Sequence, residues 1–219
     1  MLVKDFITRE TPVLKNFDSG EYALSLMDDY KLRHLPLLKD NIYQCLVSEK
    51  DLLGLADLSL PLGEPLLVSP AVRPADFIFE AMSLTTRYGL SLLPVVSEEG
   101  EYQGAVLPER LLAEVSKWCA ADGGGSVIVL EIWPQDYALS EIARLVESNN
   151  AHLLSLLSYH DITTGRTRIV LKIDLEDASP VIRSFERFDY TVVYHFMRSG
   201  VIDNELRQRM DELLFYMNM

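Results

Sequence analysis

Apolar positions in the first half of the chain follow the same order twice, with Pro36 of the first copy matched by Pro94, 58 positions later. In each copy, apolar residues three and four positions apart precede two short apolar runs that are separated by polar turn residues. The first spacing indicates one face of a helix, and the runs indicate strands. A repeat of this length predicts two copies of one supersecondary unit, neither of which buries its apolar side alone.

In the first copy, an extended segment at Thr11–Leu14 leads to a helix that starts near Ser19. Strands follow at Leu35–Leu38 and Ile42–Val47, and a second helix starts at Glu49. The order is therefore strand–helix–strand–strand–helix. The apolar residues expected on the first helix are Tyr22, Ala23, Leu26, Met27 and Tyr30.

The second copy repeats this order from an extended segment at Pro65–Pro70. Its strands are expected at Leu92–Val96 and Tyr102–Leu107. Pro74 is a start signal for its first helix, and Pro108 starts its second. The apolar residues expected on the first helix are Phe77, Ile78, Ala81, Met82 and Thr85.

Three consecutive glycines, Gly123–Gly125, interrupt this pattern and predict a flexible link between domains. The pattern after them has the order β-α-β-β-α-β of a ferredoxin-like split unit. Its predicted elements are Ser126–Trp133, Ala138–Asn149, Leu153–Asp161, Thr167–Leu175, Pro180–Phe188 and Tyr190–Phe196. The fold class is thus α+β. The predicted divisions are the two copies, the linker, the split unit and a C-terminal helix, at 1–60, 61–118, 119–125, 126–197 and 198–219.

The C-terminal segment carries an apolar stripe at helical spacing. The stripe consists of Ile202, Leu206, Met210, Leu213, Leu214 and Met217. Such a stripe packs either on its own domain or against a second copy of the chain, and the sequence leaves both open.

The net charge of −13 argues against a nucleic-acid partner and against an anionic membrane surface. The two cysteines, Cys45 and Cys119, are too few for a disulfide-built scaffold and predict free, buried thiols. The N-terminus has no signal-peptide pattern, and no apolar run has the length of a membrane span. We therefore expect a cytoplasmic protein.

Ser48 and Asp51 stand where a strand gives way to a helix. One interpretation is structural, because a hydroxyl three residues before a carboxylate forms a capping box. The other is functional, because backbone N–H groups at such a position favour a polar or anionic ligand. The second copy has Leu107 and Arg110 in the equivalent places.

The tandem pattern resembles a pair of CBS (cystathionine-β-synthase) domains, also called a Bateman module, over roughly residues 1–118. The resemblance is carried by four segments: Leu35-Pro36-Leu37, Leu46-Val47-Ser48-Glu49-Lys50-Asp51-Leu52, Leu93-Pro94-Val95 and Gly104-Ala105-Val106. It implies two repeats packed around a pseudo-twofold axis, with clefts that hold AMP, ADP, ATP or S-adenosylmethionine.

The resemblance implies that Asp51 accepts hydrogen bonds from ribose hydroxyls, that Ser48 supports ribose or phosphate, and that Thr11–Val13 flank the base. Arg33 and His34 are candidate phosphate partners by charge, and a solvated helix end is the other interpretation. The candidate nucleotide-binding residues are Thr11, Pro12, Val13, Arg33, His34, Pro36, Ser48 and Asp51.

The sequence departs from the family in both copies. Cys45 stands where the first copy of the family has glycine, and Leu107 and Arg110 replace the hydroxyl and carboxylate of the second. Leucine cannot donate to a phosphate, and arginine cannot accept from a ribose. We therefore expect at most one conventional nucleotide site per chain.

Residues 126–196 resemble an ACT domain, a small regulatory fold that binds amino acids at dimer interfaces. The tandem is similar to that of bacterial acetoin-utilisation regulatory proteins. The family's ligand loop carries a glycine, whereas Trp133–Tyr137 has none. This difference weakens an amino-acid site and leaves dimerisation as the role of the domain.

No catalytic or metal-binding motif accompanies these features. The four histidines, His34, His152, His160 and His195, lack metal-ligand spacing, and no phosphate loop or nucleophile motif is present. We expect a non-enzymatic regulatory homodimer that senses an adenosine ligand, requires no cofactor and acts on an unknown protein. The alternatives are a ligand-free interaction module with vestigial clefts and a small enzyme.

Overall fold

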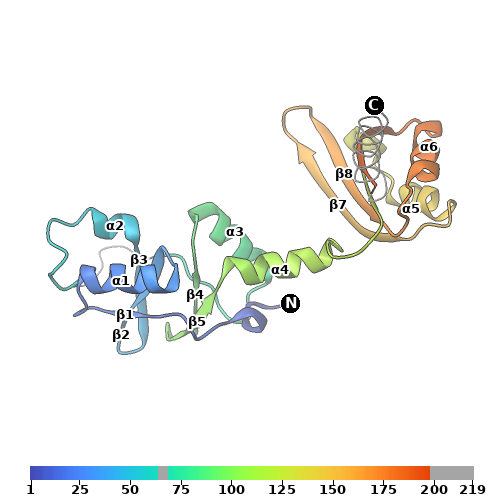
Figure 1. Ribbon diagram of the computed structural model, residues 1–219. Helices are drawn as coiled ribbons and strands as arrows, with labels where there is room; N and C mark the ends of the chain where they lie inside the picture. Colours follow the sequence, from blue (N-terminus) through green and yellow to red (C-terminus); the bar gives the residue numbers. More distant parts are fainter. Residues whose placement is uncertain (64–68, 198–219) are drawn as a thin grey trace, which may run out of the picture. The chain divides into compact units, whose positions relative to one another are not determined.

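A computed structural model describes residues 1–63 and 69–197 of the chain (Figure 1). The chain forms two compact units, Met1–Glu114 and Val115–Met219. The predicted extended segment at Pro65–Pro70 lies largely outside the described residues, and the C-terminal stripe lies wholly outside them. No helix in the described part is both long and apolar enough to cross a membrane.

The first copy has the predicted order of elements and forms a three-stranded sheet in the order β1-β2-β3. β1 is parallel to β2, and β2 is antiparallel to β3. The Ser19 hydroxyl caps α1 by accepting from the Tyr22 N–H at 3.2 Å, and Lys31 ends the helix in a left-handed conformation. The elements are η1 (Val3–Phe6), β1 (Leu14–Lys15), α1 (Gly20–Tyr30), β2 (His34–Lys39), β3 (Ile42–Ser48) and α2 (Glu49–Leu53).

The second copy contains α3 (Ile78–Tyr88), β4 (Leu93–Val96), β5 (Tyr102–Val106) and α4 (Pro108–Trp118). β4 and β5 form an antiparallel pair. A single bridge between Val72 and Val95 runs parallel, as β1 and β2 do in the first copy. The twofold repetition of the unit is confirmed.

Two equivalent hydrogen bonds join the two copies. The Tyr43 N–H donates to the Gly100 carbonyl at 3.0 Å, and the Tyr102 N–H donates to the Asn41 carbonyl at 2.9 Å. Tyr43 and Tyr102 are 59 positions apart, as are Asn41 and Gly100. The two hydrogen bonds are therefore related by the repeat, as a pseudo-twofold axis requires.

The buried helix faces differ in part from the predicted stripes. On α1 the core side chains are Ala23 and Met27, whereas Tyr22 and Tyr30 are half exposed. Tyr22 points about 100° away from Ala23 around the helix, and Tyr30 is the last residue of α1, so both reach water with their hydroxyls. Phe77 was expected in the core and is half exposed, because it lies at the N-cap of α3 and outside its first turn.

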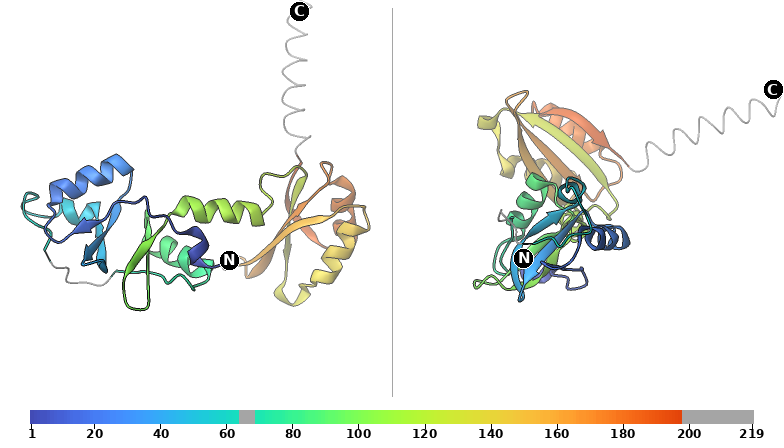
Figure 2. Two further views of the ribbon diagram at one scale, coloured as in Figure 1. Left: turned by 90° about the horizontal axis from the view of Figure 1, so that it is seen from below. Right: turned by 90° about the vertical axis from the view of Figure 1, so that its left-hand side faces the viewer.

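The second unit is a four-stranded antiparallel sheet in the order β7-β8-β6-β9. α5 and α6 cover one face of it (Figure 1, Figure 2). Ile128 and Leu130 of β6 meet Ile142 of α5 and Phe185 of α6 in the core. The predicted ferredoxin-like topology is confirmed. Its elements are β6 (Ser126–Ile132), η2 (Pro134–Asp136), α5 (Leu139–Glu147), β7 (Leu153–Asp161), β8 (Arg166–Ile173), α6 (Ser179–Arg187) and β9 (Thr191–Phe196).

Candidate functional site

Four of the predicted site residues gather at one end of the β2–β3 ladder. His34 begins β2 and pairs in register with Ser48, the last residue of β3. The Glu49 N–H donates to the Arg33 carbonyl at 2.9 Å, which joins the start of α2 to the start of β2. Arg33, His34, Ser48 and Asp51 therefore occupy one small region.

Ser48 and Asp51 form the capping box that their spacing predicts. The Ser48 hydroxyl accepts from the Asp51 N–H at 3.1 Å and donates to Asp51 Oδ2 at 2.6 Å. The Ser48 N–H also approaches Oδ2, at 3.4 Å. Asp51 remains exposed, so its carboxylate is held in a fixed orientation at the surface.

Ser91 of the second copy completes this region, and sequence reasoning missed it. Its hydroxyl accepts from the Arg33 N–H at 2.9 Å, and its own N–H donates to His34 Nδ1 at 3.2 Å. Because Nδ1 accepts, the neutral ring carries its proton on Nε2. Ser91 lies 58 positions after Arg33, so the two residues are equivalent in the repeat, but the sequence alone does not show that they meet.

The pKa of His34 is lowered from its ordinary value, chiefly because burial disfavours the charged ring. The Arg33 guanidinium lowers the pKa further, and the Asp51 carboxylate opposes the shift. His34 is therefore neutral near pH 7 and is not a cationic phosphate partner there.

This shift predicts that the first unit loses stability as the pH falls through about 6.5, where His34 of the unfolded chain takes up its proton first. His34→Gln keeps an acceptor but removes the titration. Its melting temperature should therefore fall less than that of the wild type between about pH 7.5 and 5.5. His160→Gln, on exposed β7 of the other unit, is the matched control. Equal losses in His34→Gln and the wild type would contradict the prediction.

The structure places the other candidate residues in different surroundings. The Thr11 hydroxyl lies 3.2 Å from the Tyr102 hydroxyl of the second copy. Pro12, beside it, is partly buried. Val13 lines a cavity of about 370 Å³ next to the β2–β3 turn, with Phe17 among its walls. Pro36 is buried in the middle of β2, so its side chain belongs to the core in this structure.

The departures from the family pattern also have structural partners. Arg110 extends its guanidinium to the Ile7 carbonyl, with Nη1 at 3.4 Å. Cys45 is buried in β3, and burial followed by the nearby Asp51 charge raises the pKa of its thiol to about 11. Cys45 is thus a protonated core residue near pH 7.

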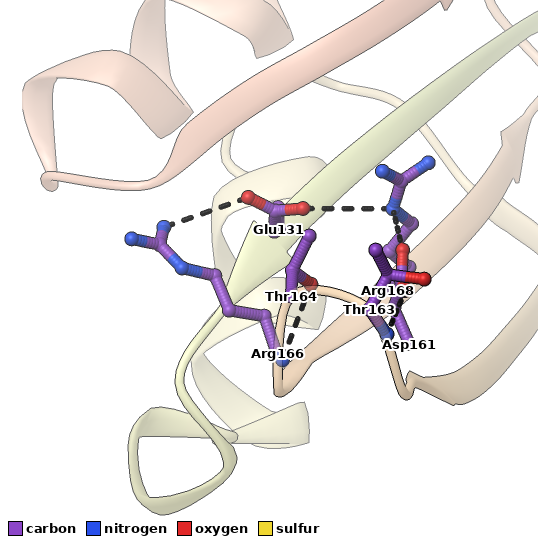
Figure 3. Close-up of polar contacts among 6 residues, drawn as sticks. All are labelled: Glu131, Asp161, Thr163, Thr164, Arg166 and Arg168. Carbon is purple, nitrogen blue, oxygen red and sulfur yellow. Dashed lines mark hydrogen bonds and ion pairs between the residues drawn. The ribbon is translucent and has the colours of Figure 1, made fainter.

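The second unit has a cavity of about 340 Å³ beside the predicted ligand loop. Trp133 and Asp136 of this loop line it, together with Arg166, Phe188 and Tyr190. The Arg166 guanidinium lies 4.6 Å from the Trp133 ring centroid and pairs with Glu131 at 3.5 Å (Figure 3). These contacts place a cation of the chain itself over the aromatic ring.

No cluster of three or more metal-ligating side chains occurs within residues 1–63 and 69–197. Both cysteines are free, and only Cys45 is buried, since Cys119 is partly exposed. The expectation of two buried thiols is therefore correct for one of them.

Comparison with known proteins finds similarity to a described domain family in the first unit. A family model described as the CBS domain matches residues 3–57 and 68–117. A CBS domain pair/ACT domain protein from Thermotoga maritima is similar in structure, with a TM-score of 0.48 and 26% identity over 52% of this chain and 96% of that one. The CBS-pair protein CBSX2 from Arabidopsis thaliana gives a TM-score of 0.45 and 25% identity over 52% and 93%.

Among curated proteins, inosine-5′-monophosphate dehydrogenase of Korarchaeum cryptofilum is 31% identical over 108 residues. This match covers 47% of the present chain and 22% of the enzyme. The chain thus corresponds to less than a quarter of the length of that relative.

Proposed function

We propose that this chain, of which residues 3–57 and 68–117 match the CBS domain, is a non-enzymatic regulatory protein that binds an adenosine-containing ligand at Asp51. The observation that carries the proposal is the fixed, exposed Asp51 carboxylate, held through the Ser48 hydroxyl at 2.6 Å. An ionised carboxylate accepts charge-assisted bonds from two vicinal hydroxyls, which is the chemistry that a ribose presents.

The surroundings of Asp51 support a nucleoside ligand that carries charge. Arg33 is exposed beside it and supplies a positive charge for a phosphate or carboxylate group. Neutral His34 offers an Nε2–H donor there. The ligand class is AMP, ADP, ATP or S-adenosylmethionine. Arg110 occupies the position of the second carboxylate, so we assign one such site to each chain.

Regulation follows from the contact between the two copies at this position. Arg33 and His34 of the first copy bond to Ser91 of the second, next to the proposed ligand. A ligand that binds differently to two arrangements of the copies shifts their populations by that difference in affinity. We propose that the change is transmitted to the second unit or to a protein partner. The protein acts as a cytoplasmic homodimer in this proposal.

Thermal melting with AMP, ADP, ATP and S-adenosylmethionine tests the function. A ligand at about 100 times its dissociation constant adds roughly 2.7 kcal/mol to the stability of the folded state. The proposal expects at least one of the four to raise the melting temperature, and inorganic phosphate to raise it much less. No rise with any of the four ligands would contradict it.

The second candidate function is a ligand-free interaction module. It is favoured by the capping box, which already gives Ser48 and Asp51 a structural role, and by the loss of the second site at Leu107 and Arg110. Absorbance of the purified protein at 260 nm, which detects copurified nucleotide, distinguishes the two candidate functions. A vestigial cleft retains no nucleotide.

A further inference from the structure

The sheet of the second unit has an apolar face that α5 and α6 do not cover. Strand register defines it, because residues paired across strands point to the same side. Leu157, Val170, Val129 and Tyr194 form one row across all four strands, from β7 through β8 and β6 to β9. We call this side the open face. Its apolar and aromatic residues are Val127, Val129, Leu157, Tyr159, Val170, Tyr194 and Phe196.

Large side chains of the open face are accessible to water. Leu157, Tyr194 and Phe196 are 46%, 59% and 40% exposed. The solvent side of an antiparallel sheet normally alternates to polar residues, whereas this row is apolar on all four strands. A contiguous apolar surface of this kind marks an interaction site.

Polar groups border the row on both sides. On one side, Arg168 approaches Glu131 and Asp161, with Nε at 3.5 and 3.2 Å from their carboxylates (Figure 3). On the other side, the Ser155 hydroxyl donates to the Cys119 carbonyl at 3.2 Å. The open face is therefore an apolar strip with polar edges, wide enough for one partner element.

From this face and the sequence that follows β9, we propose that the segment 198–219 forms an amphipathic helix that lies on the open face of its own chain. The segment lies outside the described residues, and the proposal rests on its sequence. β9 ends at Phe196, which itself belongs to the open face, so the segment begins at the edge of the surface. Ser199 and Gly200, residue types typical of turns, precede the apolar stripe. The stripe consists of Ile202, Leu206, Met210, Leu213, Leu214 and Met217.

The dimensions of a helix match this surface. A helix spanning the stripe is about 24 Å long, and four neighbouring strands span about 15 Å across the sheet. A helix laid across the strands, along the apolar row, is therefore long enough to cover Leu157, Val170, Val129 and Tyr194.

Charge is complementary between the two surfaces. The open face carries three basic side chains and two acidic ones, Arg166, Arg168, Lys172, Glu131 and Asp161. The segment carries four acidic side chains and three basic ones, Asp203, Glu205, Asp211, Glu212, Arg198, Arg207 and Arg209. The listed side chains give the open face a net positive charge, in a chain whose net charge is −13, and they give the segment a net negative charge.

Met210→Asp in the full chain tests the proposal, with Gln208→Asp as its control. At helical spacing Gln208 lies opposite the stripe, so both variants add the same charge to opposite sides. The proposal expects Met210→Asp to increase the fluorescence of a dye that binds apolar surface about twofold and to lower the melting temperature of the second unit by about 5 °C. Gln208→Asp is expected to change neither.

Tyr194→Asp provides a second measurement on the face itself. Its effect on melting should match that of Met210→Asp in the full chain and should vanish in a chain that stops after Met197. Identical behaviour of Met210→Asp and Gln208→Asp would overturn the proposal. A Met210→Asp variant that changes the mass of the assembly in light scattering would also overturn it, because the segment would then act between two copies.

Discussion

Asp51→Ala is expected to abolish the thermal stabilisation that an adenosine ligand gives to the wild type. A ligand at about 100 times its dissociation constant contributes roughly 2.7 kcal/mol, which raises the melting temperature of a domain of this size by about 10 °C. Without the carboxylate, the ribose hydroxyls lose their charged acceptor. Melting curves with and without ligand, recorded for both proteins, measure the difference directly.

Asp57→Ala is the matched control for this substitution. Asp57 is also an exposed carboxylate that accepts from a serine hydroxyl, with Ser59 Oγ at 2.6 Å. Both variants therefore lose a similar local structure, and comparison of their unliganded melting temperatures isolates the effect of the capping box. Asp57→Ala should retain the ligand response. An undiminished response in Asp51→Ala would place the ligand elsewhere.

Gly104→Ala is expected to destabilise the first unit by about 3 kcal/mol or more. Gly104 has a φ of +133°, which side-chain-bearing residues rarely adopt. A methyl group there would lie 2.5 Å from the Thr8 carbonyl oxygen and 2.6 Å from Ile7 Cγ2. That backbone cannot retreat easily, since Thr8 and Ala105 exchange two hydrogen bonds of 2.8 and 2.9 Å.

Denaturant unfolding of Gly104→Ala and of a control, Gly124→Ala, measures this effect. Gly124 has no neighbouring atom within 4 Å of an added methyl group and no left-handed φ. Its variant should unfold at the same denaturant concentration as the wild type. A Gly104→Ala variant as stable as the control would show that the N-terminal segment does not pack against β5 as described.

The parts of the fold that could be predicted depend on local periodicity. The alternation of apolar runs and turns places β2 and β3 within a residue or two, and the Ser48–Asp51 spacing predicts a capping box that the structure contains. The β-α-β-β-α-β order also predicts the strand order of the second unit, because few connections of six such elements avoid crossing.

The contacts between the two copies could not be predicted from the sequence. Ser91 is an ordinary turn residue until the fold sets it against Arg33 and His34. Thr8 and Gly104 are 96 positions apart, and only tertiary packing makes that glycine necessary. Tyr22 and Tyr30 fit a helical stripe by spacing, yet the smaller Ala23 and Met27 fill the core beneath α1.

Titration calorimetry of the wild-type protein with AMP, ADP, ATP and S-adenosylmethionine tests the central claim most directly. The account predicts saturable binding of at least one of them at one site per chain, because Asp51 has a carboxylate and its counterpart Arg110 does not. Absence of binding by all four ligands, or two equal sites per chain, would contradict it.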